Sequence, residues 1–345
     1  MHVRRLLNLA APAAASVMFV CSLQAQAPAA PQVTVSGVSY LQYVYQLKDT
    51  ANHNNNFDVT RAYINVLGKF GGGVGTRITA DIQRVGAGDN SLRYRLKYAY
   101  VTYTPTGSAL TYKLGQIHTP LLDWEEALWD YRMQGQMAME RGGYVSSSDF
   151  GLGVDGKWGP DKVNMQVGIY NGEGYAGGTG DQRKDLMGRV SFRLMDTNDS
   201  SRVGGLRVTA YGQYGKPTGG KRQRLLGMVS YRSKQFTLAG EYAITKDTVT
   251  ATPLAETSGG VASVFGVYHL TNSKAALIAR LDLTDPNTDT GNNRLTRVIA
   301  GASYQLSPNL RLLADVDMLS YEGGTPTPAL EATRSQAYFQ AQFTF

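Results

Sequence analysis

The chain has 345 residues, of which 18% are charged and 42% hydrophobic, and its formal net charge is +7. This composition is too apolar and too aromatic for a disordered chain. A single cysteine, Cys21, excludes a disulfide framework and a cysteine-based metal site, and the four histidines are scattered. Beyond the N-terminus no apolar run reaches the ~18 residues that a membrane-spanning helix needs, which excludes a helical membrane protein. We predict no cofactor and no bound metal.

Residues 1–27 have the features of an export signal. Two arginines precede a mostly apolar stretch over 6–20, and Ala25-Gln26-Ala27 matches the A-x-A pattern that signal peptidases cleave. We predict cleavage after Ala27, which removes two arginines and no acidic residue and so takes the net charge from +7 to +5. A lipoprotein site at Cys21 is the alternative, but Val20 fits poorly the small residue expected before that cysteine.

From Val33 to the C-terminus, apolar and polar residues alternate in stretches of about ten residues, separated by clusters of Gly, Asn, Asp, Pro and Ser. The stretches number about 16, an even number, and each is near the ~9–11 residues that a tilted strand needs to cross a membrane. In strands 222–232 and 261–270 apolar residues occupy both odd and even positions, so the pattern does not show which side chains point into the barrel. The predicted strands are 33–47, 56–70, 74–85, 92–104, 110–117, 150–158, 163–171, 185–195, 206–214, 222–232, 236–246, 261–270, 274–283, 295–306, 310–321 and 334–345.

The connections between these strands alternate in length. Short turns such as Gly71-Gly72-Gly73 and Ser233–Gln235 alternate with long loops, which are 118–149, 172–184, 247–260, 284–294 and 322–333. Short periplasmic turns and long extracellular loops are typical of a transmembrane antiparallel β-barrel, whose closure pairs every backbone group in the hydrocarbon. The fold class is therefore all-β, with residues 28–345 as one barrel domain. The connection Asp196–Gly205 is too long for a periplasmic turn, and the pattern does not explain it.

Several short motifs carry a family resemblance. They are Phe57–Val66 (FDVTRAYINV), Tyr98–Tyr103 (YAYVTY), Leu114–Pro120 (LGQIHTP), Asp149–Gly156 (DFGLGVDG) and Tyr170-Asn171-Gly172. In this order they resemble the phosphate-selective porin O/P family. The resemblance implies a trimeric, 16-stranded outer-membrane channel with a third loop folded inward and a basic lumen. The final Phe345 looks like the terminal aromatic that such barrels present to the barrel-assembly machinery. An outer-membrane barrel is also expected to contact lipid and lipopolysaccharide.

The polar face of each predicted strand gives the candidate lumenal charges, fifteen basic and six acidic. This surplus of nine positive charges predicts a mild preference for small anions. The alternative is that the charges pair with one another and keep the wall wet. The basic candidates are Arg61, Arg77, Arg93, Arg95, Lys97, Lys113, Lys157, Arg189, Arg193, Arg207, Arg224, Arg232, Arg280, Arg297 and Arg311; the acidic ones are Asp81, Asp155, Glu241, Asp282, Asp315 and Asp317.

The long loop 118–149 is the candidate gate. Asp123 followed by Glu126 reads as a capping box before a short helix over Trp124–Met133. If the helix folds into the barrel, it narrows the pore; the alternative is an extracellular cap. The candidate constriction residues are Asp123, Glu125, Glu126, Asp130 and Arg132. The loop is acidic where the O/P pattern is basic, which puts phosphate specificity in doubt.

Three classes of barrel protein fit these features. A passive channel for small hydrophilic solutes and ions needs only the exported barrel and a wide lumen. A barrel enzyme of the phospholipase or protease type needs a nucleophile and a base, and neither His118 nor His269 lies in a recognisable Ser/His arrangement. An adhesive barrel would carry a soluble domain, and none is visible. We predict a channel, not an enzyme, with no nucleic-acid partner.

Overall fold

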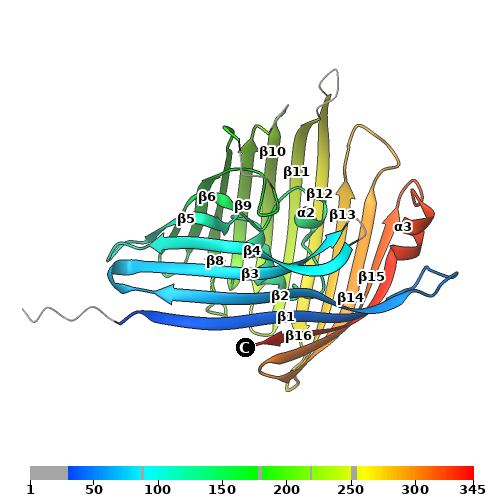
Figure 1. Ribbon diagram of the computed structural model, residues 1–345, viewed down its shortest axis with the longest axis horizontal. Coiled ribbons are helices and arrows are strands. Elements are labelled where there is room, and N and C mark those ends of the chain that lie inside the picture. Colours follow the sequence, from blue (N-terminus) through cyan, green and yellow to red (C-terminus); the bar gives the residue numbers. More distant parts are fainter. Residues whose placement is uncertain (1–29, 87–88, 178–180, 218–219, 250–254) are drawn as a thin grey trace, which may run out of the picture.

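The computed structural model describes residues 30–345 except 87–88, 178–180, 218–219 and 250–254. The predicted signal sequence over 1–27 lies outside the described residues. Sixteen strands form a closed barrel in which each strand is antiparallel to its neighbours in sequence, and β1 pairs with β16 (Figure 1). The predicted strand number and antiparallel closure are confirmed. The strands are β1 (Gln32–Gln46), β2 (Asn55–Lys69), β3 (Val74–Gly86), β4 (Asp89–Tyr103), β5 (Leu110–His118), β6 (Ser148–Trp158), β7 (Val163–Tyr170), β8 (Asp185–Met195), β9 (Gly205–Gly215), β10 (Arg222–Arg232), β11 (Phe236–Val249), β12 (Ala255–His269), β13 (Ala275–Asp285), β14 (Leu295–Ser307), β15 (Leu310–Tyr321) and β16 (Ser335–Thr344).

The barrel is apolar outside and polar inside. On β13, Leu281 and Leu283 are exposed on the outer face, whereas Arg280 and Asp282, which alternate with them, are buried inside. Successive strand residues point to opposite faces, so the alternation in the sequence becomes an outer apolar belt and a polar lumen. The described chain contains four short helices, η1 (Gly71–Gly73), α1 (Leu122–Trp129), α2 (Ala138–Arg141) and α3 (Pro328–Thr333), and none of the described helices could span a membrane.

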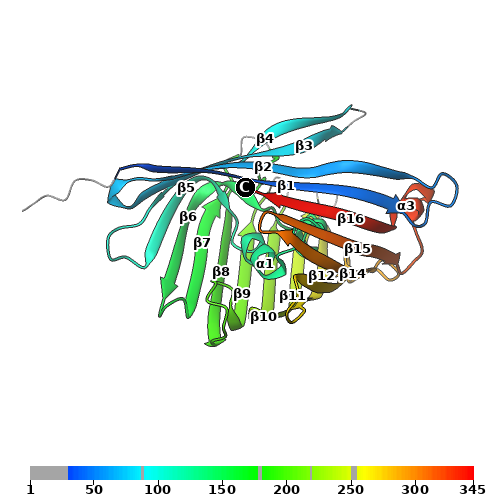
Figure 2. The ribbon, with the colours of Figure 1, turned by 90° about the horizontal axis from the view of Figure 1, so that it is seen from below.

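The loop after β5 lies inside the barrel, where Figure 2 shows α1 within the ring of strands. Its side chains pack on the inner wall: the Trp129 ring lies 5.6 Å from the ring of Phe265, and the Tyr131 hydroxyl lies 2.7 Å from Ser303 Oγ. The structure therefore places this loop as an internal element and not as an extracellular cap. The internal loop also explains why the sequence did not show which side chains of strands 222–232 and 261–270 face the lumen. Leu226 of β10 and Phe265 of β12 are apolar but point inward, where they belong to the same buried apolar cluster as the loop.

Helix α1 is shorter than the predicted Trp124–Met133. It ends at Trp129 because Asp130 takes a left-handed backbone conformation, with φ of 57°. The predicted capping box is also wrong, since the residue before the helix is Leu121 and no side chain caps it. The Asp123 carboxylate instead binds Arg202.

The long periplasmic connection 196–204 folds up into the barrel beneath α1. Val203 is buried in the cluster that holds the loop, and Asp199 accepts a hydrogen bond from Arg232 Nε at 2.7 Å. Arg202 reaches Asp123. The connection is therefore long because it supports the internal loop from below.

Candidate permeation pathway

Two adjoining cavities lie between the internal loop and the facing wall. One, of about 270 Å³, is lined by Gln42, Arg61 and Tyr338, and the other, of about 240 Å³, by Tyr40, Asp123 and Glu126. Arg132 lines both, so it lies where the two cavities adjoin. We take this space as the candidate pathway.

Arg132 is held by two carboxylates of its own loop. Its Nε donates to Glu126 at 2.7 Å, and its Nη2 donates to Glu140 at 2.9 Å. Burial would lower the pKa of this guanidinium, but the charges of Glu126 and Glu140 outweigh burial and raise that pKa above its ordinary value. The cation at the junction of the two cavities is therefore permanent.

The other charges on the free face of the loop are paired as well. Asp123 binds Arg202, and Asp130 binds Arg311 at 3.2 Å. Burial would raise the pKa of Asp123, but its interactions with the neighbouring His118 and with Arg202, which also donates a hydrogen bond to the carboxylate, hold that pKa well below its usual range. The loop thus presents to the pathway carboxylates that are paired with arginines of the loop itself, of the 196–204 connection and of β15.

The facing wall carries an excess of positive charge, which we name the β2–β4 basic patch: Arg61, Arg77, Arg95 and Lys97. Arg61 and Arg95 share the carboxylate of Asp81, at 2.9 and 3.2 Å. Arg77 bonds to Asn65 at 3.0 Å and stacks over the Tyr98 ring, and Lys97 bonds to the Tyr63 hydroxyl at 2.9 Å. Among the described residues, these four cations have one bonded carboxylate, which leaves three positive charges uncompensated.

Most of the other predicted basic residues are neutralised or lie away from the pathway. Arg93 is 64% exposed and pairs with Asp89 near the tip of the β3–β4 hairpin. Other ion pairs are Lys113 with Asp155 at 2.5 Å, Arg193 and Arg207 with Asp161 at 3.5 and 3.3 Å, Arg224 with Asp247 at 2.9 Å, Arg232 with Asp199 at 2.7 Å, Arg280 with Asp282 at 2.7 Å, and Arg297 with Asp317 at 2.5 Å. The predicted surplus of nine is thus much reduced, and the β2–β4 basic patch keeps the largest uncompensated part.

A further set of wall arginines holds the internal loop in place by donating to its backbone carbonyls. Arg189 donates to Pro120 at 2.9 Å, and its guanidinium lies 4.0 Å from the Trp124 ring. The backbone N–H groups of the barrel wall are already paired between strands, so they cannot bond to the carbonyl groups of the loop. Charge-assisted hydrogen bonds from arginine side chains satisfy these carbonyls instead. Sequence alone did not separate these residues from pore-lining ones. The other members of the set are Arg224 to Tyr144, Arg232 to Ala127, Arg280 to Gln136 and Arg311 to Asp130.

Glu125 is not a constriction residue. Its side chain is 0% exposed and faces the wall, beside Glu241 of β11. Adjacent helix positions point about 100° apart, so Glu126 faces the pathway and Glu125 cannot. Burial raises the pKa of Glu125 well above its ordinary value, and the negative charge of Glu241 adds to the effect.

Sequence reasoning missed several pathway residues. Tyr40, Gln42 and Tyr338 are uncharged members of the lining, and Arg202 comes from the unexplained connection. A search of the sequence for charged residues cannot identify the three uncharged ones. Arg202 could have been suspected from the length of its connection. Among the described residues, no cluster of three His, Cys, Asp or Glu side chains could hold a metal ion.

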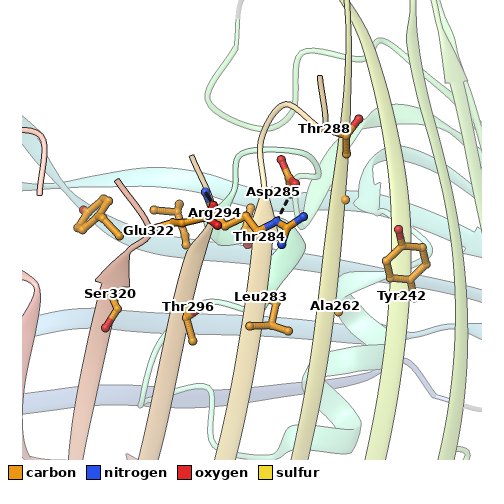
Figure 3. A pocket seen from close by; sticks show the side chains of 13 residues that line it. Tyr242, Ala262, Leu283, Thr284, Asp285, Thr288, Arg294, Thr296, Ser320 and Glu322 are labelled. Atoms are coloured by element: carbon orange, nitrogen blue, oxygen red, sulfur yellow. Dashed lines mark hydrogen bonds and ion pairs between the residues drawn. The ribbon is translucent and has the colours of Figure 1, made fainter. Parts of the chain in front are cut away.

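A larger cavity lies elsewhere, on the outer face at the extracellular ends of β11 to β15 (Figure 3). It measures about 630 Å³ and is lined by outward side chains such as Tyr242, Leu283 and Thr296. Arg294 and Asp285, 3.2 Å apart, form its polar rim. Because it opens on the apolar outer belt, it is not part of the lumen, whatever its size.

Comparison with known proteins agrees with this geometry. A loop L8 deletion mutant of OmpT, an outer membrane protein of Vibrio cholerae, has the same fold, with a TM-score of 0.65 at 13% identity over 92% of this chain and 100% of that chain. An anion-selective porin from Comamonas acidovorans gives 0.65 at 13% identity over 91% and 100%. Salmonella typhi OmpF, in complex with daunomycin, gives 0.60 at 14% identity over 91% and 97%.

Comparison with curated protein sequences finds no match. The family model for Gram-negative porins matches residues 10–324, which is most of the chain. The resemblance to a porin that the motifs indicated is thereby confirmed. The family, the closed barrel and the apolar outer belt make this an outer-membrane diffusion channel. The chain belongs to the Gram-negative porin family.

Proposed function

We propose that the channel passes small hydrophilic solutes and ions passively, with a mild preference for anions. The β2–β4 basic patch carries this proposal, since its cations outnumber their bonded carboxylates by three while the carboxylates of the facing loop are paired with arginines. Cationic rings favour anions where a pore is narrow, because there the ion has least water and the field is least screened. A protein of the same fold, from Comamonas acidovorans, is described as anion-selective, which supports the proposal.

The proposal does not extend to phosphate. Glu126 and Asp123 line the pathway and temper its positive field. A multivalent anion would gain from a strongly basic constriction, and this loop does not provide one. We therefore expect little discrimination between phosphate and chloride.

We also propose that the barrel has no catalytic activity. His118 is the last residue of β5, directly before the internal loop. Its ring stacks on the Tyr98 ring at 4.0 Å, and its Nε2 lies 3.1 Å from Nη1 of Arg77. These partners fix the imidazole as part of the wall, and they do not include a serine or cysteine nucleophile of the kind that a hydrolase requires.

For export and assembly, we propose that residues 1–27 are removed after Ala27 and that the mature chain forms a homotrimer in contact with lipid and lipopolysaccharide. One form of Vibrio cholerae OmpT with the same fold is described as a trimer, which supports the oligomeric state. Phe345 ends the outward aromatic row of β16 and is 60% exposed, which suits recognition by the barrel-assembly machinery.

The selectivity is tested by reversal potentials across planar bilayers in a KCl gradient. The unmodified channel is expected to favour chloride, and the double variant Arg61→Gln with Arg77→Gln is expected to move the reversal potential toward potassium. Arg93→Gln is the matched control, because it removes a cation from the exposed hairpin tip. Cation selectivity in the unmodified channel, or equal shifts in the control and the double variant, would contradict the proposal.

A further inference from the structure

Tyr175 brings an aromatic ring from an extracellular loop onto the β2–β4 basic patch. It belongs to the connection between β7 and β8, far in sequence from the patch that it touches. Its hydroxyl accepts a hydrogen bond from Arg95 Nη2 at 3.2 Å, and the Arg95 guanidinium lies 4.4 Å from the ring centre. The Lys97 ammonium lies 5.7 Å from the same ring. One aromatic ring thus contacts two lumenal cations.

Lys97 is a buried cation that forms no ion pair with any residue in the described part of the chain. Its side chain is 2% exposed, and within the described part of the chain no carboxylate oxygen lies within 4.0 Å of its nitrogen. An ammonium has three hydrogen-bond donors, and one of them bonds to the Tyr63 hydroxyl. The rings of Tyr63, Tyr98 and Tyr175 surround the ammonium at 4.8, 5.8 and 5.7 Å and add cation–π stabilisation.

The local backbone directs this arrangement. The pairing of β3 with β4 shifts register between Thr79 and Ala80, and opposite that step Lys97 has no partner residue. Lys97 and Tyr98 are consequently both buried on the lumenal side, although neighbours in a regular strand point to opposite faces. The bulge thus places a cation and a ring side by side in the wall.

We propose that Arg95 and Lys97 form a binding subsite for small carboxylates borne on an aromatic ring, and that Tyr175 occupies this subsite when no solute is bound. The solute's ring takes the place of the Tyr175 ring against the guanidinium. Its carboxylate accepts the hydrogen bonds that the Lys97 ammonium and Arg95 can still donate, which a phenol can satisfy only in part. The inference rests on the proposed function, because it names a class of anion that the channel favours.

The test uses block of KCl current by benzoate, with cyclohexanecarboxylate as a probe of equal charge and similar size that has no aromatic face. Benzoate is expected to half-block the channel at an about tenfold lower concentration, which corresponds to one cation–π contact of about 1.4 kcal/mol. Tyr175→Ala should strengthen the block, since it removes the internal competitor. Tyr175→Phe keeps the ring and should remain close to the unmodified channel.

Lys97→Met and Arg95→Gln should each abolish the preference for benzoate, whereas Lys113→Met, which removes a different lumenal lysine, should keep it. Heat-modifiable migration in SDS checks that each variant is folded. If one of the two subsite variants does not fold, the other still tests the subsite. Equal block by the two acids, or an unchanged preference for benzoate in both subsite variants, would overturn the subsite. The reversal potential in KCl alone, recorded before the acids are added, tests the anion preference separately.

Discussion

Arg202 holds Asp123 through two hydrogen bonds, from Nη1 to the carboxylate at 2.7 Å and from Nη2 to the main-chain carbonyl at 2.6 Å. The two residues are 79 positions apart, one in a periplasmic connection and the other in α1. Each fixes the other, so the position of the internal loop depends on a segment at the periplasmic rim. The low pKa of Asp123 keeps this pair ionised well into the acid range.

Replacement of Arg202 by alanine should loosen α1 from the periplasmic side. Hydrogen bonds to charged groups contribute about 1.5–3 kcal/mol each, and solvent screening at this half-exposed pair places the loss at the lower end. Single-channel recordings should then show more current noise and closure at lower voltage. Lys234→Ala is the control, because Lys234 is an exposed cation at the same rim. Recordings of the Arg202 variant that match those of the control would refute this role.

The docking of α1 should weaken as the pH rises. Burial, together with Glu241, raises the pKa of Glu125 in the folded protein, so its contribution to stability is fully present below the ordinary glutamate pKa of 4.5. That contribution is lost as the pH rises through the raised value, because two buried carboxylates then repel each other. Thermal unfolding in detergent between about pH 4 and 10 should show a decline that Glu125→Gln flattens. Glu322→Gln, on an exposed extracellular loop, should leave the decline in place.

Two neighbouring glutamates should differ in their effect on selectivity. Glu126 lines the pathway, so Glu126→Gln should move the reversal potential toward anions. Glu125 lies behind α1, so Glu125→Gln should leave it unchanged near neutral pH. Both variants remove one formal carboxylate from the same helical turn, and each controls for the other. The assignment of α1 faces fails if both shift the potential equally.

The C-terminal residue should matter for assembly more than for the finished channel. Phe345 closes the barrel through two backbone hydrogen bonds with Gly37, at 2.9 and 3.1 Å. Its ring also lies over Gly37, where an added Cβ would meet ring carbon Cε1 at 2.2 Å. Deletion of Phe345 should lower the amount of heat-modifiable barrel in the outer membrane while export continues, and Gly37→Val should do so more weakly.

Phe339→Ala is the control for that experiment, since Phe339 belongs to the same outward row but lies away from the strand end. Normal outer-membrane levels of the Phe345 deletion variant, with unchanged resistance to SDS before heating, would count against the assembly role.

Alternation in the sequence was sufficient for the barrel because a strand has two faces and lipid meets one of them. It failed for β10 and β12, where Leu226 and Phe265 are apolar and point inward. There the inner face packs against another part of the chain, and apolar character no longer distinguishes lipid from lumen. The same ambiguity hid the arginines that bind loop carbonyls, since Arg189 and Arg61 have the same place in an alternating pattern.

The sequence by itself determined the strand number, the antiparallel order, the two rims and the long loop, because these follow from local periodicity and from the lengths of connections. Tertiary structure alone decided that the 196–204 connection supports α1, that Glu125 turns away from the pathway, and that Tyr175 reaches the basic patch. Each of these depends on contacts between segments distant in the chain. Such contacts are set by how the loops fold back into a closed barrel, which no local pattern records.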